Sequence, residues 1–276
     1  MYLAYWGLSQ SPFRGNLDPR YFQQGPAQDE ALARLDFLVE QRRTLGLLLG
    51  GPGSGKSLLL EFFARELGVV NRQPAVVSLV GIGRREFLWL LGGQLGTETL
   101  SSAGEFALGR AVEDHIIANR HQQIATILLL DDADEAAREV LDEIARLARL
   151  NQISDARLTM VLAARGRQLH KLGTRILELA ELRVDLVGWD QDDTAAFVKK
   201  SLAAAGRSTP IFSESALRRL HELTGGVPRR VKQLADLALL GGAGANLAHL
   251  ESDLIDAVFD ELGVVTTDSP VGAAAG

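Results

Sequence analysis

Short apolar runs alternate with longer amphipathic stretches through most of the chain. Such runs predict buried strands, and stretches with apolar residues at helical spacing predict the helices between them. This alternation is typical of an α/β fold with a doubly wound parallel sheet. The expected strands are Leu45–Leu49, Ala75–Val80, Ala125–Leu130, Leu158–Ala163 and Leu182–Val187. The expected helices are at about 28–42, 83–95, 104–121 and 134–150, with one more beginning near Gly55.

From Trp189 onward the pattern predicts helices alone. Ser213 is a suitable N-cap for one of them, with Glu214 in its first turn. Pro228 suits the first turn of the next. These helices are expected at about 191–204, 213–223, 227–240 and 250–262, and they form a small all-helical lid domain.

The same pattern predicts four parts of the chain. Residues 1–43 hold an aromatic and proline-rich segment with a helix that packs on the core, and residues 44–188 form the α/β domain. Residues 189–263 form the helical lid. The last residues, 264–276, carry no periodicity and are expected to be a disordered tail.

Between the first expected strand and its helix lies the segment Gly50-Gly51-Pro52-Gly53-Ser54-Gly55-Lys56-Ser57. A strand, a GxxxxGK[ST] loop and a helix in this order make a P-loop that binds phosphates. Glycines let backbone N–H groups turn towards a phosphate, and the helix N-terminus adds its positive dipole end. Lys56 is expected to reach the β- and γ-phosphates and Ser57 to ligate Mg²⁺. The chain is thus expected to bind ATP and Mg²⁺, with nucleotide contacts from Gly51, Pro52, Gly53, Ser54, Gly55, Lys56, Ser57 and Leu58.

A second phosphate motif follows the buried run Thr126–Leu130, which ends in two acids, Asp131 and Asp132. In P-loop enzymes the first acid holds Mg²⁺, usually through water, so this role is expected for Asp131. The second position normally orients the attacking water, and Asp132 is the expected general base. Asp134 and Glu135 are alternatives, but their residue types better suit the first turn of the next helix.

Three further positions hold arginines that suit charge stabilisation. Arg165 follows the fourth strand, where a polar group would face the γ-phosphate, or else it points into solvent. Arg229 lies at a predicted helix start in the lid and could swing onto the nucleotide, with Arg230 as the fallback. The alternative for both is an exposed arginine pair.

Composition narrows the possible classes of protein. The 276 residues contain no cysteine, which excludes disulfides and thiolate metal sites, and five scattered histidines show no metal-ligand spacing. The first residues lack a basic n-region, and no apolar run reaches the roughly 20 residues that span a bilayer. These features predict a cytoplasmic protein. The net charge of −6 disfavours a broad nucleic-acid surface.

The opening segment, the two phosphate motifs and the lid motif together resemble the AAA+ ATPases of the general secretion pathway protein A group, also called ExeA-like. Relatives of that group include the MshM pilus-biogenesis ATPases. Gly225–Leu240 resembles the family's lid segment, in which Arg229 matches the sensor-2 arginine. The resemblance covers about residues 1–263. The residues that match the family's opening are Tyr2, Trp6, Gly7, Leu8, Pro12, Phe13, Asp18, Pro19, Arg20, Glu30, Ala31, Leu32 and Leu35.

The resemblance implies an ATPase that works as a homo-oligomer, a ring or a filament, in which a neighbour supplies an arginine finger. Arg175 is the expected finger, with Arg183 behind it. It also implies a membrane-anchored partner from a type II secretion or type IV pilus-like machine, which would bring the chain to the inner membrane without insertion. The secretion proteins proper continue into a membrane span and a periplasmic peptidoglycan-binding domain, and this chain is expected to act without them.

Two departures from the family change the expected chemistry. The family usually carries Asp-Glu where this chain has Asp131-Asp132, so the base is about one methylene shorter and hydrolysis is expected to be slow. The family usually has Gly-Gln where this chain has Ala164-Arg165, which weakens the sensor-1 assignment of Arg165.

Three functions remain open. The first is an ATPase that assists assembly or function of a secretion or pilus-like machine. The second is a DNA-associated AAA+ regulator similar to TniB/TnsC or Orc/Cdc6 proteins, which the acidic balance disfavours and the arginine pairs at 42–43, 84–85 and 229–230 keep open. The third is an ATP-gated scaffold with weak hydrolysis, suggested by Asp132.

Overall fold

The fold was analysed in a computed structural model that describes residues 2–13, 22, 25–68, 71–97, 103–152 and 157–263. The chain divides into two compact units. We call residues 17–187 the sheet unit, and residues 1–16 with 188–276 the helical unit. The predicted tail 264–276 and the motif residues Asp18, Pro19 and Arg20 lie outside the described residues.

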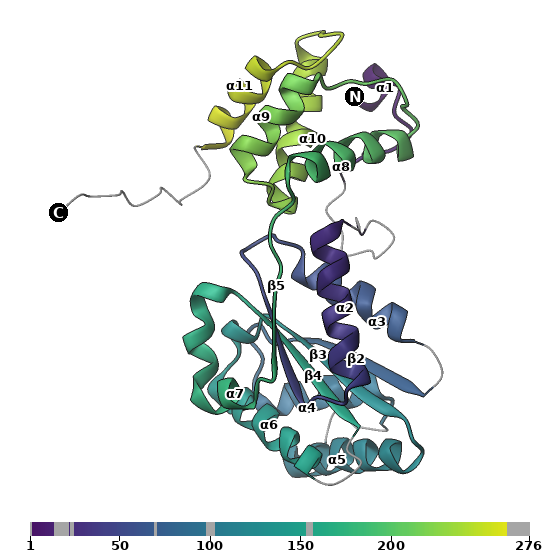
Figure 1. The fold of residues 1–276 in the computed structure, drawn as a ribbon, viewed down its shortest axis with the longest axis vertical. Helices are drawn as coiled ribbons and strands as arrows, with labels where there is room; N and C mark the ends of the chain where they lie inside the picture. The colour runs from purple at the N-terminus through teal and green to yellow at the C-terminus, as the bar shows by residue number, and fades with distance from the viewer. Residues whose placement is uncertain are drawn as a thin grey trace, which may run out of the picture. The chain divides into compact units, whose positions relative to one another are not determined.

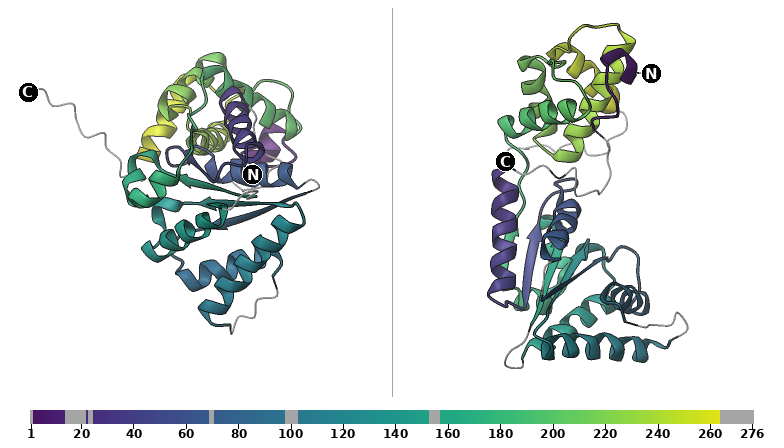
Figure 2. Two further views of the ribbon diagram at one scale, coloured as in Figure 1. Left: turned by 60° about the horizontal axis from the view of Figure 1, so that its bottom comes forward. Right: turned by 90° about the vertical axis from the view of Figure 1, so that its right-hand side faces the viewer.

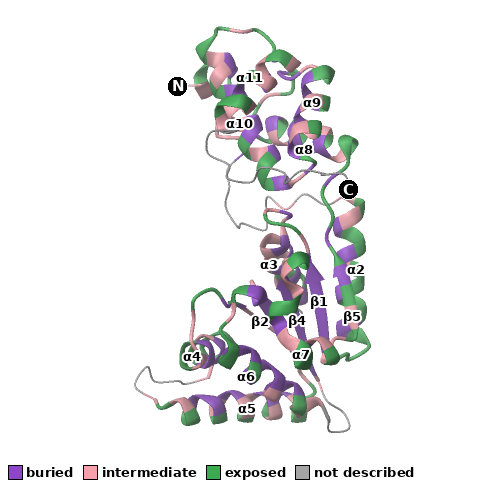
Figure 3. Ribbon diagram, turned by 90° about the vertical axis from the view of Figure 1, so that its left-hand side faces the viewer, coloured by how far each residue is buried: buried purple, intermediate pink, exposed green. Residues whose placement is uncertain are grey.

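The sheet unit is built on five parallel strands in the order β2-β3-β4-β1-β5 (Figure 1). The predicted parallel α/β fold is thereby confirmed. Interior strand β1 is buried along its whole length, as a parallel strand covered on both faces should be (Figure 3). The strands are β1 Leu45–Leu49, β2 Arg72–Ser78, β3 Ala125–Asp131, β4 Leu158–Ala164 and β5 Leu182–Asp185.

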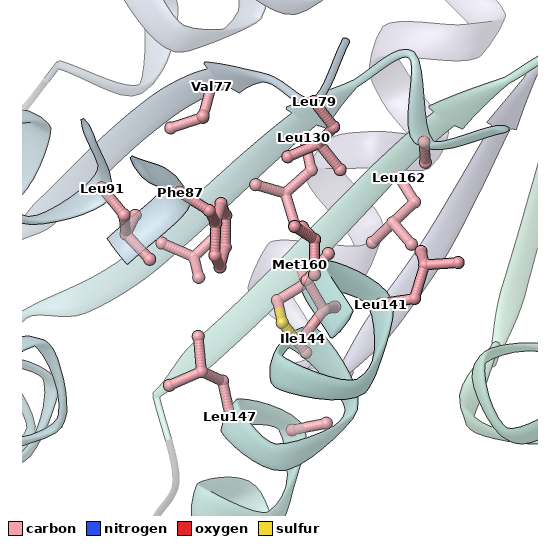
Figure 4. Close-up of a cluster of buried hydrophobic side chains, with 14 of the residues drawn as sticks. Val77, Leu79, Phe87, Leu91, Leu130, Leu141, Ile144, Leu147, Met160 and Leu162 are labelled. Carbon is pink, nitrogen blue, oxygen red and sulfur yellow. The ribbon is translucent and has the colours of Figure 1, made fainter. Parts of the chain in front are cut away.

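Side chains that alternate along β1, β2, β3 and β4 enter two separate hydrophobic clusters, one on each face. In β1, Leu45, Leu47 and Leu49 join one cluster and Leu48 joins the other. On the second face α2 approaches closely: a Cβ built on Gly46 would lie 2.7 Å from Leu38 Cδ2. Figure 4 shows the first cluster, in which strand and helix side chains interdigitate.

Helices cover both faces of this sheet (Figure 2). Residues of α2 and α3 belong to the cluster on one face. Residues of α4, α5, α6 and α7 belong to the cluster on the other. Their bounds are α2 Pro26–Glu40, α3 Lys56–Leu67, α4 Arg84–Leu95, α5 Glu105–His121, α6 Arg138–Ala148 and α7 Gly173–Leu179, and three 3₁₀ segments are η2 Ala133–Glu135, η3 Arg149–Gln152 and η4 Gly166–Leu172.

The helical unit packs a first short helix against four longer ones around its own hydrophobic cluster. Trp6, which is 2% exposed, donates its Nε1–H to the carbonyl oxygen of Leu239 at 2.8 Å. Ser213 caps α9 by accepting from the backbone N–H of Ala216 at 3.1 Å, as predicted. The helices are α1 Tyr2–Trp6, α8 Gln191–Ala204, α9 Glu214–Thr224, α10 Pro228–Gly244 and α11 Ser252–Gly263.

The first residues of the chain correct one expectation. Residues 1–43 were expected to form one part of the chain, an aromatic segment with a helix that packs on the core, but Trp6, Leu8 and Phe13 are buried among residues of α8 to α11. Only α2, from the later part of that range, packs on the sheet. Side chains of the opening segment thus form part of the hydrophobic core of the helical unit.

Element bounds differ from the predicted ones where turn chemistry or a sheet edge intervenes. Strand β2 begins at Arg72, ahead of Pro74, and not at Ala75, because β2 is an edge strand and an edge tolerates a proline. Helix α6 begins at Arg138, not near residue 134, because a 3₁₀ segment precedes it. Helix α7 was not expected, since its sequence is short and follows a 3₁₀ segment directly.

Candidate functional site

The strand order brings three loops of the sheet unit to one edge of the sheet. Strand β4 lies between β1 and β3, with Leu49 opposite Ala164 and Leu130 opposite Leu162. All strands are parallel, so the loop after β1, the acids after β3 and the residue after β4 leave the sheet side by side. The carboxyl edge of an open parallel sheet is where such folds bind ligands.

The loop after β1 has the geometry of a phosphate cradle. Gly53 and Gly55 have φ angles of 76° and 99°, in the left-handed region that favours glycine. A Cβ built on Gly51 or Gly55 would meet no atom within 4 Å, so open space adjoins the loop backbone. Gly50 is tighter, because its Cβ would lie 2.5 Å from Ser54 Oγ. The loop thus requires glycines for its shape and leaves room for a ligand.

Two further features of the loop suit a bound phosphate. Helix α3 begins at Lys56 directly after Gly55, and no side chain caps its first N–H groups. The hydroxyl of Ser54 is buried and has no hydrogen-bond partner among the described residues. Unpartnered donors at a helix N-terminus form an anion site. The residues present therefore fit a nucleotide phosphate.

Lys56 is buried within this loop at 7% exposure. Its Nζ donates to the carbonyl oxygens of Gly50 at 3.0 Å and Gly51 at 3.2 Å. Burial lowers the pKa of Lys56, and the neighbouring carboxylates of Asp131 and Asp132 act in the opposite direction. The ammonium group of Lys56 thus interacts electrostatically with the carboxylates of Asp131 and Asp132.

Asp131, the last residue of β3, and Asp132, the next residue, differ from each other in their surroundings. Asp131 is 7% exposed, and its Oδ1 accepts from the backbone N–H of Asp132 at 2.9 Å. Asp132 is half-buried, with φ 53° and ψ 41°, a left-handed conformation that aspartate adopts more readily than most residues. Burial raises the pKa of Asp132, and the adjacent Asp131 carboxylate raises it further.

These residues fit Mg²⁺ as P-loop proteins hold it. Among the described residues, no group of three or more acidic or histidine side chains could hold a metal without help. Magnesium needs no such cage, because it keeps several waters and takes one or two protein ligands beside the phosphate oxygens. Ser57, in the first turn of α3, and Asp131 supply oxygen donors of the kind it prefers.

Arg165 takes a position that the sequence did not foresee. It follows β4 as expected, but it points neither freely towards a phosphate nor into solvent. Its Nε donates to Asp134 Oδ2 at 2.5 Å, and its terminal nitrogens pair with Glu135 and with Gln168 Oε1, the latter at 2.9 Å. Residue types alone carried no signal for this pairing.

The same contacts correct the expectation for two acids. Asp134 and Glu135 were expected in the first turn of the helix after β3, but α6 starts later, at Arg138. Asp134 instead lies in η2 with its side chain 1% exposed, and it faces Arg165. Burial alone would raise the pKa of Asp134, but its hydrogen bonds and ion pair with Arg165 outweigh burial and lower it.

The remaining predicted arginines are exposed. Arg175 lies on α7, with its Nη1 4.0 Å from Asp142 Oδ1 on α6. Arg183 lies on β5 and its Nη2 contacts Asp185 Oδ1 at 2.8 Å. Arg229 and Arg230 lie in the first turn of α10, in the helical unit. The finger role predicted for Arg175 and Arg183 and the lid role predicted for Arg229 and Arg230 stay predictions.

Sequence and fold comparisons agree with this geometry. Residues 39–172 match the family described as AAA domain. General secretion pathway protein A of Aeromonas hydrophila is 27% identical over 270 residues, which are 96% of this chain and 49% of that protein. The chain thus spans about half the length of that relative. The described residues contain no helix that is long and apolar enough to cross a membrane.

Solved structures with the same fold match residues of both units. The ORC2 protein of Aeropyrum pernix has a TM-score of 0.71 at 16% identity and covers 94% of this chain and 73% of its own. Cdc6p of Pyrobaculum aerophilum has a TM-score of 0.65 at 18% identity, with coverage of 87% and 67%. At such identities the likeness concerns the fold. The AAA domain match and the similarity to the Aeromonas protein support a resemblance to AAA+ ATPases of the general secretion pathway protein A type.

Proposed function

We propose that this chain binds ATP with Mg²⁺ and hydrolyses it to assist assembly or function of a type II secretion or type IV pilus-like machine. The observation that carries the ATPase part is the phosphate loop, with its left-handed glycines, uncapped helix start and buried lysine, beside the acids of β3. The similarity to general secretion pathway protein A supports the secretion part.

In this proposal, the loop residues Gly51 to Leu58 surround the phosphates and bind them through backbone N–H groups, except Pro52, which has no N–H to donate. Lys56 stabilises the negative charge of the β- and γ-phosphates, and its burial in the loop keeps the ammonium close to them. Ser57 and Asp131 hold Mg²⁺, which neutralises phosphate charge when bound. Arg229 adds positive charge from the start of α10.

Asp132 orients the attacking water and accepts its proton. A base must lie within hydrogen-bond reach of that water, and Asp132 is about one methylene shorter than glutamate. Burial and the Asp131 carboxylate raise its pKa, which makes it a better proton acceptor than an exposed aspartate. The shorter side chain places the carboxylate further from the water, so slow hydrolysis remains the expected behaviour of the isolated chain.

Assembly completes the site in this proposal. A homo-oligomer, either a ring or a filament, would bring an exposed arginine of one copy to the γ-phosphate of the next. Arg175 is 57% exposed at its side chain and is the first choice, and Arg183 follows. Such a finger is worth roughly 10³–10⁵ in rate in related phosphoryl-transfer systems. A membrane-anchored component of the machine would hold the oligomer at the inner membrane.

A nucleotide-gated scaffold is the second candidate, and the observation that favours it is the backbone of Asp132. Its left-handed conformation and short side chain fix the carboxylate near the end of β3, so a water would have to move towards it. In this case ATP binding, not turnover, would control assembly.

Phosphate release by the purified chain, measured across protein concentration, tests the proposal. A specific activity that rises with concentration, and that Lys56→Ala abolishes, supports an ATPase completed by a neighbour. ATP binding with release no higher than that of Lys56→Ala overturns the ATPase and leaves the scaffold. Copurification of a membrane-anchored secretion or pilus component tests the pathway, and recovery of DNA-processing proteins alone contradicts it.

A further inference from the structure

The ends of β3 and β4 are tied together by one carboxylate, that of Asp134. Its Oδ1 accepts from the backbone N–H of Arg165 at 3.0 Å, and its Oδ2 accepts from Nε of the same arginine at 2.5 Å. Glu135 and Gln168 hold the terminal nitrogens of that guanidinium. A single residue after β3 therefore fixes both the main chain and the side chain of the residue after β4.

This tie is buried and charged. The side chain of Asp134 is 1% exposed and that of Arg165 is 30% exposed. The preceding residue, Ala133, is fully buried in the hydrophobic cluster on that face of the sheet. A buried carboxylate that lost its arginine would be left uncompensated, which is strongly unfavourable. The pair therefore resists being opened.

The tie acts on the residue proposed to orient the attacking water. Asp132 lies between the end of β3 and η2, and its carbonyl oxygen accepts from the backbone N–H of Glu135 at 2.9 Å. Its left-handed backbone has only a small allowed region. Asp132 is thus held on one side by β3 and on the other by η2, which Asp134 anchors to β4.

We infer that Asp134 and Arg165 form a clamp that positions Asp132 beside the phosphate loop. Arg165 then acts through Asp134, as a positioning residue, and not as a direct ligand of the γ-phosphate. This inference rests on the proposed hydrolysis and deepens it, because it names what sets the geometry of the shortened base.

The test compares Asp134→Asn, Arg165→Gln and the double variant with the parent chain. Asp134→Asn keeps an oxygen that can accept from the backbone of Arg165 but removes the charge that holds the guanidinium. Arg167→Gln is the matched control, because Arg167 is exposed in η4, two residues after Arg165, and the substitution removes the same guanidinium group. The measurements are kcat and KM for phosphate release, and the affinities for fluorescent ATP and ADP analogues.

A misplacement of about 1 Å can cost about a hundredfold in rate, so each single variant is expected to lower kcat by about 10- to 100-fold. Both nucleotide affinities should change by less than about threefold. The double variant should lose about as much kcat as the more severely affected single variant, because the two residues act as a unit. Arg167→Gln should match the parent. A merely structural role would lower the midpoint of thermal unfolding and both affinities without this selective loss of kcat.

Unchanged kcat in Asp134→Asn, with a parent that hydrolyses ATP, overturns the clamp and leaves the proposed function standing. A loss of preference for ATP over ADP in Arg165→Gln also overturns it, since the arginine would then contact the γ-phosphate itself. A parent that binds ATP but releases no phosphate overturns the proposed hydrolysis and the clamp with it. If Asp134→Asn does not fold, Arg165→Lys provides the same test, because it keeps the charge and loses the Nε donor.

Discussion

The phosphate loop and the acid loop lie at the same edge of one sheet but are built in different ways. The phosphate loop, residues 50–57, takes its shape from its own sequence, through two left-handed glycines and a helix that begins directly after them. The acid loop, residues 131–135, takes its shape from a contact with Arg165, 31 residues further along the chain. Substitutions in the first should therefore act locally, and those in the second should act through a partner.

The largest expected effect tests the local shape of the phosphate loop. Gly55→Ala forces a Cβ into a backbone with φ 99°, which costs on the order of 1–3 kcal/mol or makes the loop change shape. The helix start would then lose its alignment with the phosphates, so we expect ATP binding and phosphate release to fall by at least about a hundredfold. Equilibrium binding of a fluorescent ATP analogue measures this directly.

Gly93→Ala is the matched control for that change. Gly93 lies in α4, its φ is outside the left-handed region, and a Cβ there would meet no atom within 4 Å. The substitution should leave ATP binding intact and raise stability by roughly 0.5–1 kcal/mol, the usual gain for alanine over glycine in a helix. Equal loss of binding in both variants would contradict a local role for Gly55.

A second, smaller effect concerns the length of the base in the acid loop. Asp132→Glu extends the carboxylate towards the water while the clamp still holds the backbone, so we expect turnover to rise several-fold, or about tenfold at most. Glutamate suits a φ of 53° less well than aspartate, so stability should fall slightly. Steady-state phosphate release checks the rate, and a flat or abolished rate would show that Asp132 is not a shortened base.

A third prediction uses pH to test how much the ion pair between Asp134 and Arg165 contributes to stability. Burial opposes ionisation of Asp134, but the hydrogen bonds and charge of Arg165 outweigh the effect of burial. They lower the pKa of this carboxyl below its usual value of about 4. The ion pair therefore stabilises the fold above about pH 4 and loses this contribution as the pH falls towards the folded-state pKa.

Asp134→Asn should accordingly lower the free energy of unfolding by about 1–3 kcal/mol at pH 7. The difference between parent and variant should shrink as the pH falls from about 5 to about 3. Urea unfolding at a series of pH values measures it. A difference that does not depend on pH would mean that charge is not what ties the two strand ends together.

The smallest expected effect on stability concerns the N-cap of α9 in the helical unit, which, like the phosphate loop, depends on residues close together in the sequence. Ser213→Ala removes the hydroxyl that accepts from Ala216 N–H at the start of α9. We expect a loss of about 1 kcal/mol in unfolding free energy, with phosphate release unchanged, because only the first turn of α9 is affected. Thermal unfolding of the parent and the variant checks it, and a larger loss would imply that Ser213 also matters through Glu251, its partner at 2.7 Å.

Elements whose signals are local could be predicted from the amino-acid sequence. Strands β1 and β4, the phosphate loop and the N-cap at Ser213 were predicted because apolar periodicity, glycine placement and capping chemistry act over a few residues. The AAA+ assignment came from the family resemblance of the opening segment, the two phosphate motifs and the lid motif, while the alternation of strands and helices predicted the parallel sheet.

Contacts between residues far apart along the chain became apparent only in the fold. Arg165 and Asp134 are separated along the chain, and nothing in either residue type specifies the partner; the pairing follows from β3 and β4 being neighbours in the sheet. The opening aromatics Trp6 and Phe13 likewise pack in the helical unit and not on the sheet. Burial and charge pairing depend on spatial neighbours that sequence spacing does not encode, which is why these contacts escaped prediction while the loops themselves did not.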